Sequence, residues 1–159
     1  FIRGIIQVRN RGEIRIGDNF RINSGKSFNP IGGDIVSRFI VRDDGFLSIG
    51  NNVGISNSTI VSCKSVIIED YVYIGGGCRI WDTDFHSLDP IQRCHQGDMN
   101  TAVKPIVIKK YSFIGASSII LKGVVIGENS IVAAGSIVTK SIPDNQIWGG
   151  NPAEYIRDL

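Results

Sequence analysis

The stretch that decides the fold covers residues 106–140 and reads IVIKKYSFIGASSIILKGVVIGENSIVAAGSIVTK. A large aliphatic residue recurs in it at every sixth position without a slip, and the residue two places earlier is mostly small. The aliphatic series comprises Ile108, Ile114, Ile120, Ile126, Val132 and Val138, and the earlier positions hold Ile106, Ser112, Ser118, Val124, Ser130 and Ser136. A strict repeat of this length predicts a repeating backbone.

A six-residue period has a direct structural interpretation. Side chains alternate across a strand, so the aliphatic residue and the residue two places earlier face the same way. The remaining positions supply a corner, where Gly123, Asn129 and Gly135 tolerate turn geometry. Short strands joined by corners give a solenoid with a continuous aliphatic interior. Three hexads per coil and about fifteen hexads predict about five coils.

An earlier block repeats the pattern. It runs through Ile49, Ile55 and Val61 and, after one extra residue, through Ile68, Ile74 and Ile80, with a weaker beginning at Ile16 and Ile22. The alternative is a β-sandwich, which shows turns every 8–12 residues and no fixed period. We therefore predict an all-β solenoid and treat residues 1–159 as a single domain.

The composition agrees with β structure. The chain has 28 Ile and 13 Val against 4 Leu and 5 Ala, and its 19 Gly exceed the usual share. These numbers exclude a helical bundle, a coiled coil and a disordered chain. The net charge of +2 is too small to argue for a nucleic-acid partner.

Other classes of protein are excluded by simple features. No uncharged apolar run approaches the roughly 20 residues of a membrane span. Phe1 begins no recognisable signal peptide, and, because it is not Met, the position of the native start stays open. Cys63, Cys78 and Cys94 show no metal-binding spacing, so we expect reduced thiols in a cytoplasmic protein.

The hexads resemble the [LIV]-[GAED]-x-x-[STAV]-x repeat of the hexapeptide acyltransferases. The segment from Ile126 to Lys140, followed by Gly150-Asn151-Pro152-Ala153, resembles the branch of sugar O-acetyltransferases that act on galactosides, maltose, nodulation factors and exopolysaccharides. The resemblance implies a left-handed parallel β-helix of about five coils with a short C-terminal extension, although parallel crossovers are generally right-handed. It also implies acetyl-CoA as co-substrate and a homotrimer with active sites between subunits.

The main break in the period covers residues 86–105 and holds both histidines, His86 and His95. Transfer of an acetyl group to an alcohol needs a base, and a histidine pKa of about 6.5 suits that task. The resemblance implies that a histidine at the start of this loop is the catalytic base, and His86 occupies that place. The alternative for His86 is a plain loop residue, and we take His95 as a solvated loop residue.

Two further residues are candidates for the acceptor site. Strand alternation places Asp82, Asp84 and His86 on one face. Asp84 could therefore orient His86, bind an acceptor hydroxyl or cap a turn. The resemblance implies an acceptor-binding asparagine near Asn57, for which a corner asparagine is the alternative. Cys63 stands where the family uses a carboxylate, so the acceptor's identity is not carried over.

The resemblance also implies a set of coenzyme A contacts. The backbone amide of Ala116 would face the thioester, Ala134 would line the pantetheine arm, Thr139 and Lys140 would lie by the nucleotide, and Arg157 would lie near the phosphates. An amide aimed at an oxyanion lowers a barrier by roughly 2.7–4 kcal/mol, and cationic side chains bind phosphate through charge-assisted hydrogen bonds. The alternatives are repeat packing for the alanines and solvated surface for Lys140 and Arg157.

The resulting hypothesis is an acetyl-CoA-dependent O-acetyltransferase that acetylates a hydroxyl of a sugar or polysaccharide precursor. Transfer would be direct, in a ternary complex, because Cys63 and Cys78 fall within the coils. Alternatives are an amino-sugar N-acetyltransferase, an antibiotic O-acetyltransferase, a non-catalytic solenoid and a γ-type carbonic anhydrase. The last needs three zinc-binding histidines where this sequence has two, so no metal is predicted. The acceptor and the role of a second interruption, 29–45, stay open.

Overall fold

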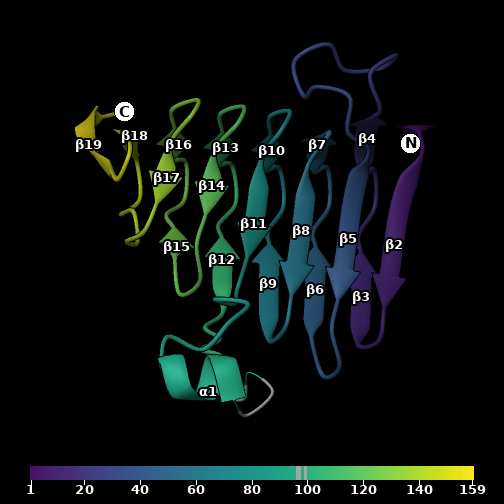
Figure 1. The fold of residues 1–159 in the computed structure, drawn as a ribbon. Coiled ribbons are helices and arrows are strands. Elements are labelled where there is room, and N and C mark those ends of the chain that lie inside the picture. Colours follow the sequence, from purple (N-terminus) through teal and green to yellow (C-terminus); the bar gives the residue numbers. More distant parts are fainter. Residues whose placement is uncertain (96–97, 99) are drawn as a thin grey trace.

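The computed structural model describes residues 1–95, 98 and 100–159. The chain forms a left-handed parallel β-helix, in which three-sided coils stack from the N-terminal to the C-terminal end (Figure 1). The expected fold class is confirmed. Three sheets form the sides of the prism and are called sheets A, B and C.

Each coil contributes one short strand to each sheet. Sheet A contains β1 (Ile2–Gly4), β4 (Arg21–Ser24), β7 (Gly54–Ser56), β10 (Tyr73–Ile74), β13 (Phe113–Ile114), β16 (Ile131–Val132), β18 (Gln146–Gly150) and β19 (Ala153–Asp158). Sheet B contains β2 (Ile6–Asn10), β5 (Ser37–Val41), β8 (Thr59–Ser62), β11 (Arg79–Trp81), β14 (Ile119–Ile120) and β17 (Ile137–Val138). Sheet C contains β3 (Glu13–Ile16), β6 (Phe46–Ile49), β9 (Ser65–Ile68), β12 (Ile106–Ile108) and β15 (Val125–Ile126).

These strands make five complete coils and part of a sixth. The sixth coil holds β16 and β17 and reaches sheet C through a single parallel bridge between Ile126 and Ile142. The antiparallel hairpin β18–β19 follows and is the short C-terminal extension. The first coil begins at Ile2, before the region where the six-residue period is visible in the sequence.

The interior of the prism contains the repeated aliphatic residues. All six members of the C-terminal series are fully buried: Ile108, Ile114, Ile120, Ile126, Val132 and Val138. The small inward positions carry serines whose hydroxyls bind corner carbonyls. Ser112 donates to the carbonyls of Lys109 and Gly127 at 2.7 and 2.8 Å. Ser118 and Ser130 make the same pair of contacts, so these three serines tie the corner of their own coil to the corner of the next.

One position of the earlier block was assigned wrongly. Ile60, not Val61, pairs with Ile80 and lies fully buried, while Val61 pairs with Trp81. The steps between inward residues are therefore five residues and then eight, instead of six and seven. A short corner followed by a long corner shifts the register by one residue, which reverses the faces of the strand between them.

A buried carboxylate stabilises the longer corner. Asp82 is fully buried, and its oxygens accept hydrogen bonds from the backbone N–H groups of Cys63, Lys64 and Ser65, each at 2.7 Å. The longer corner leaves these three N–H groups without a partner in a neighbouring strand, and the Asp82 carboxylate accepts from all of them.

Two segments leave the prism. Residues 25–36 form a loop between β4 and β5, drawn at the top of Figure 1. This interruption is shorter than the predicted 29–45 because residues 37–41 form the regular strand β5. Residues 82–105 form the larger excursion between β11 and β12, drawn at the bottom of Figure 1, and contain the helix α1 (Pro90–His95).

The stacked interior predicts the effect of a truncation. Ile114→Ala removes most of a fully buried side chain, and the stacked coils cannot close the cavity that remains. We therefore expect the free energy of unfolding, measured with urea, to fall by about 2–5 kcal/mol. Ile119→Ala, at a half-buried outward position of β14, should cost much less. Equal losses at the two positions would contradict the assigned register.

Candidate functional site

Backbone contacts hold the base of the excursion. Thr83 and Val103 form an antiparallel bridge, the Asp84 N–H donates to the Ala102 carbonyl at 3.0 Å, and the Lys104 N–H donates to the Asp82 carbonyl at 2.9 Å. The excursion therefore leaves the prism as a short two-stranded stem beside the buried Asp82. His86 follows this stem directly.

The His86 imidazole is presented to solvent, with 70% of its side chain exposed. Its Nδ1 atom contacts a carboxylate oxygen of Asp98, and the other oxygen of Asp98 accepts a hydrogen bond from the Ser87 N–H at 2.6 Å. One carboxylate thus holds both the ring and the adjacent backbone. This contact leaves Nε2 as the ring nitrogen available to a substrate.

Asp98 is ionised at neutral pH. The Ser87 N–H is the main cause that lowers the pKa of this carboxyl below its ordinary value, and the hydrogen bond and charge of His86 act in the same direction. Sequence reasoning missed Asp98 because it lies twelve residues beyond His86 in a segment without a repeat. The only available signal was an acidic residue in the same excursion. Gln96, Gly97, Met99 and the side chain of His95 lie outside the described residues.

Helix α1 also contacts the segment that follows His86. Asp89 precedes the helix, and its carboxylate accepts from the N–H groups of Ile91 and Gln92 at 2.8 and 3.3 Å, as an N-cap does. The Arg93 guanidinium donates to the Ser87 carbonyl at 2.8 Å. The backbone after His86 is therefore held at both its N–H and its carbonyl.

Asp84 lies at the base of the excursion and pairs with the next coil. Its Oδ1 atom lies 2.7 Å from the Lys122 ammonium, and its Oδ2 atom is buried without a hydrogen-bond partner among the described residues. The hydrogen bonds of the described residues include none between Asp84 and His86, whose ring Asp98 holds instead. A role of Asp84 toward the acceptor remains a prediction.

Asn57 lies in a different part of the prism, under the loop 25–36. It is fully buried, its Oδ1 accepts from the Gly25 N–H at 2.5 Å, and its Nδ2 donates to the carbonyls of Gly33 and Asn29 at 3.4 and 3.5 Å. These contacts attach the loop to the prism and occupy the polar atoms of the side chain.

Ala116 and Ala134 stand in the turns that join sheet A to sheet B, which we call the A–B corner (residues 56–58, 75–78, 115–118 and 133–136). The coils approach closely there. A Cβ atom on Gly75 would lie 2.6 Å from the Ala116 nitrogen, and one on Gly115 would lie 2.5 Å from the Ala134 nitrogen. Ala116 is partly exposed, and the hydrogen bonds of the described residues include no acceptor for its N–H.

The remaining coenzyme A candidates lie elsewhere. Thr139 and Lys140 are exposed in the turns that join sheet B to sheet C, called the B–C corner (residues 62–64, 82–105, 121–124 and 139–141). Arg157 is exposed on β19, opposite Ile147. The predicted residues thus fall into groups: Asn57, Ala116 and Ala134 at the A–B corner, and Asp84, His86, Thr139 and Lys140 at the B–C corner.

The two thiols within the coils are poor nucleophiles. Burial raises the pKa of Cys63, and the nearby Asp82 charge adds to this effect. Burial also raises the pKa of Cys78. Both thiols therefore stay protonated at neutral pH.

The described residues contain neither a metal-binding cluster nor a membrane-spanning helix. No three His, Cys, Asp or Glu side chains gather there in a group that could hold a metal ion. No helix in this part of the chain is both long and apolar enough to cross a bilayer.

Known proteins share the six-residue repeat of this chain. The family model described as the hexapeptide repeat of succinyl-transferase matches residues 105–140. Protein CapG of Staphylococcus aureus is 57% identical over 113 residues, which cover 71% of this chain and 53% of that protein. The chain spans 53–58% of the length of the curated relatives it matches.

Solved structures with enzymatic descriptions share the fold along nearly the whole chain. AntD, an N-acyltransferase from Bacillus cereus in complex with dTDP and coenzyme A, has a TM-score of 0.77 and 25% identity, covering 99% of this chain and 80% of AntD. The hexapeptide-repeat acetyltransferase VCA0836 from Vibrio cholerae, in complex with acetyl-CoA, has a TM-score of 0.65 and 27% identity, covering 97% and 70%. Residues 105–140 of this chain thus carry the hexapeptide repeat, and the fold is that of these hexapeptide-repeat acyltransferases.

These matches confirm the resemblance of the hexads to the repeat of the hexapeptide acyltransferases. The matched repeat includes Ala116, Ala134, Thr139 and Lys140 but not the excursion. The family model therefore carries no information on His86 or Asp98.

The lowered pKa of Asp98 predicts how the excursion responds to acid. Stability that depends on this carboxylate is present above the ordinary aspartate pKa and is lost as the pH falls through the lowered pKa of the folded state. We expect the exchange protection factor of the Ser87 amide, measured by NMR, to fall in that acidic range. Asp98→Ala should abolish the protection at every pH. Asp34→Ala, in the other loop, is the control, and protection unaffected by Asp98→Ala would contradict the assigned contact.

Proposed function

We propose that this chain transfers an acetyl group from acetyl-CoA to a hydroxyl of a saccharide. The observation that carries the proposal is the His86–Asp98 pair, which presents an oriented imidazole on an excursion from a hexapeptide-repeat prism. The relatives support the co-substrate, because AntD is described with coenzyme A and VCA0836 with acetyl-CoA.

In this mechanism His86 is the general base. Its Nε2 takes the proton of the acceptor hydroxyl while the hydroxyl oxygen attacks the thioester carbonyl. The carbon–sulfur bond then breaks, and the coenzyme A thiolate receives the proton from His86. Asp98 keeps the proton on Nδ1, so that Nε2 is free to accept, and stabilises the imidazolium that forms. The protonated thiols of Cys63 and Cys78 support direct transfer without an acyl-enzyme.

The acetyl carbonyl needs a donor as its oxygen becomes negative. The Ala116 N–H is the proposed donor, because it lies on a partly exposed corner and lacks a protein acceptor among the described residues. Ala134 would border the pantetheine arm along the same corner. Thr139, Lys140 and Arg157 would contact the nucleotide and its phosphates, to which Lys and Arg offer charge-assisted hydrogen bonds.

The positions of these residues support an active site shared between copies of the chain. Ala116 lies in the A–B corner and Lys122 in the B–C corner, on either side of β14, and the six residues between these positions span at most about 20 Å. His86 lies at the Lys122 end through the Asp84–Lys122 pair. His86 and Ala116 of one chain thus lie at different corners, and we propose that the acetyl group is held between His86 of one copy and Ala116 of another.

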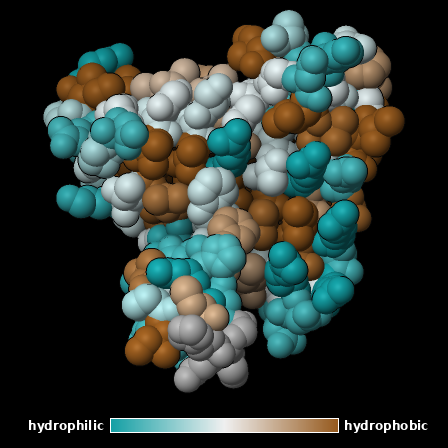
Figure 2. Space-filling view, in the orientation of Figure 1, coloured by the Kyte–Doolittle hydropathy of each residue, from teal (hydrophilic) through white to brown (hydrophobic). Residues whose placement is uncertain are grey.

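Apolar side chains are available for such an assembly. Ile119 and Ile137 lie half-buried on the outside of sheet B, and brown apolar patches reach the surface between polar groups in Figure 2. We propose a homotrimer in which one subunit supplies His86 and its neighbour supplies Ala116. A monomer in light scattering would contradict this arrangement. Reduced thiols and an acetyl-CoA co-substrate support a cytoplasmic location.

N-acetylation of an amino sugar is the second candidate. It is favoured by the likeness to AntD, which is described as an N-acyltransferase. The same histidine can take a proton from an ammonium-derived amine or from a hydroxyl, so the site geometry alone is compatible with both. Mass spectrometry of products from matched amino and hydroxy sugars separates the two reactions.

The first test removes the proposed base. His86→Ala should lower acetyl transfer by about 10²–10⁴-fold, because a positioned general base contributes that much. The measurement is thiol release from acetyl-CoA with a panel of saccharide acceptors. His95→Ala, at the other histidine of the excursion, is the matched control and should stay near wild type. Transfer by His86→Ala within a few-fold of wild type would overturn the mechanism.

The second test concerns Asp98 as a positioning residue. Asp98→Asn leaves one acceptor oxygen where the carboxylate has two, so the side chain can no longer accept from both Ser87 and His86. When the oxygen faces Ser87, the amide nitrogen faces Nδ1 of His86 and favours the tautomer with its proton on Nε2. We expect kcat to fall by about tenfold or more while KM changes little. A change in KM alone, with kcat preserved, would show that Asp98 only shapes the loop.

A further inference from the structure

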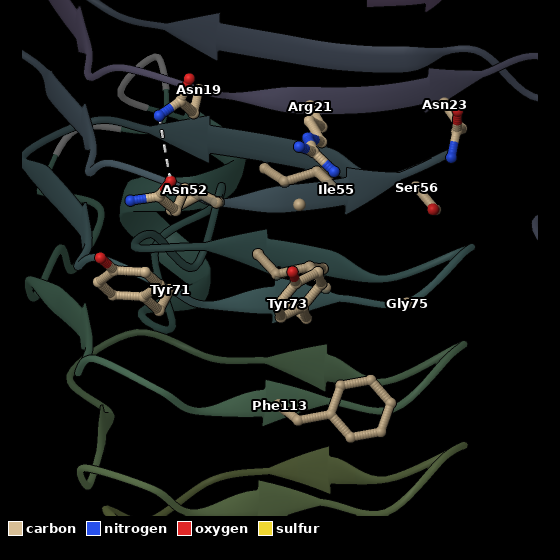
Figure 3. A pocket seen from close by; sticks show the side chains of 13 residues that line it. Asn19, Arg21, Asn23, Asn52, Ile55, Ser56, Tyr71, Tyr73, Gly75 and Phe113 are labelled. Carbon is tan, nitrogen blue, oxygen red and sulfur yellow. Dashed lines mark hydrogen bonds between the residues drawn. The ribbon is translucent and has the colours of Figure 1, made fainter. Parts of the chain in front are cut away.

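A pocket of about 460 Å³ lies on the outer face of sheet A, apart from the excursion (Figure 3). Its centre follows one row of outward positions on neighbouring strands. Arg21 of β4 pairs with Gly54 of β7, Gly54 pairs with Tyr73 of β10, and Tyr73 pairs with Phe113 of β13. Strand spacing places the Arg21 and Tyr73 backbones about 9.6 Å apart, with Gly54 between them.

Glycine at position 54 opens this pocket. The Tyr73 ring lies against it, since a Cβ on Gly54 would come within 2.8 Å of the ring. Tyr73 nevertheless remains 58% exposed, and Phe113 on the next strand is 46% exposed. Two aromatic side chains thus reach solvent side by side, on a surface otherwise made of short strands. Such rings offer flat faces for another planar group.

Arg21 is the one formally charged residue among the 13 that line the pocket. Arg21 points into the pocket in Figure 3, and the ion pairs and hydrogen bonds of the described residues include none to its guanidinium. None of the 13 lining residues, all of them described, is acidic. The uncharged groups include Asn19 and Asn52, joined by a hydrogen bond of 3.2 Å, and Asn23 and Ser56 at the other end. The pocket therefore favours a ligand that is planar at one part and anionic at another.

The pocket also extends to the proposed transfer site. Gly75 lines it, and the close approach of Gly75 to the Ala116 nitrogen places that end of the pocket at the A–B corner. A ligand held over Gly54 would thus direct its far end toward the amide that is proposed to face the thioester.

We propose that this pocket binds a nucleoside diphosphate, the carrier part of a nucleotide-linked sugar that serves as acceptor. The base stacks on Tyr73 and Phe113, the diphosphate contacts Arg21, and the sugar extends past Asn23 and Ser56 toward Ala116. The volume is in the range of small-molecule sites. This inference rests on the proposed function and specifies its substrate class.

The test uses uridine 5′-diphosphate as the probe and calorimetry of the intact protein without acetyl-CoA. We expect saturable binding that Tyr73→Ala weakens about 5- to 150-fold, the range for loss of one base–aromatic stack. Arg21→Gln should weaken it about tenfold or more, and removal of the phosphates, tested with uridine, should have a similar effect. Arg9→Gln, at an exposed strand arginine on sheet B, is the matched control and should bind as wild type.

Three outcomes would overturn the inference. The first is absence of uridine 5′-diphosphate binding, and the second is equal affinity for uridine and its diphosphate. The third is tighter binding of a neutral oligosaccharide such as maltotriose, with an affinity that Arg21→Gln leaves unchanged. Failure of the proposed function is distinguishable. Acetyl transfer without diphosphate binding contradicts only the pocket assignment, and diphosphate binding without acetyl transfer to any acceptor contradicts only the enzymatic proposal.

Discussion

The register of the stacked coils is the constraint on which the rest of the structure depends. Each strand has only two to five residues within the regular coils, so an individual strand pair is weak, and the aliphatic columns inside the prism hold neighbouring coils in place. A slip of one residue would turn an entire inward set toward solvent. Three inward serines, Ser112, Ser118 and Ser130, add direct links, because the hydroxyl of each lies within hydrogen-bond distance of carbonyls in two successive corners. Gly75 and Gly115 allow these corners to approach within distances that no Cβ permits.

A rigid stack makes its interruptions suitable places for chemistry. The excursion begins beside Asp82, whose buried carboxylate holds the long corner of the preceding coil, and Asp84 ties it to Lys122 of the following coil. The imidazole of His86 is thus exposed on a segment that is fixed at its base and clamped by Asp98. At the A–B corner the Ala116 N–H has no protein acceptor among the described residues, and it is the donor that we propose for the thioester carbonyl. These two elements lie at different corners of the prism, on either side of sheet B.

Much of the fold and part of the site could be predicted from the sequence. The period identified the interior residues of the C-terminal coils and the break that holds His86. It failed at Ile60, where a short corner precedes a long one, because corner lengths are set by bonds such as those of Asp82 and not by local pattern. The first coil could not be recognised in the sequence either, because the spacing of its repeated residues is irregular. Asp98 could not be assigned, because it meets His86 across twelve residues of aperiodic chain. The contacts that the buried Asn57 makes with the loop 25–36 were not evident in the sequence either.

The sequence by itself determined the solenoid, its parallel coils and the single candidate base, because side-chain alternation and the hexad spacing are local properties of the chain. Only the tertiary structure decided which partners the polar side chains have and which residues share a corner. Those facts depend on contacts between segments twelve or more residues apart, such as Asp98 with His86 and Asp84 with Lys122. The pocket on sheet A is of the same kind, since Arg21, Gly54, Tyr73 and Phe113 become neighbours only when four coils stack.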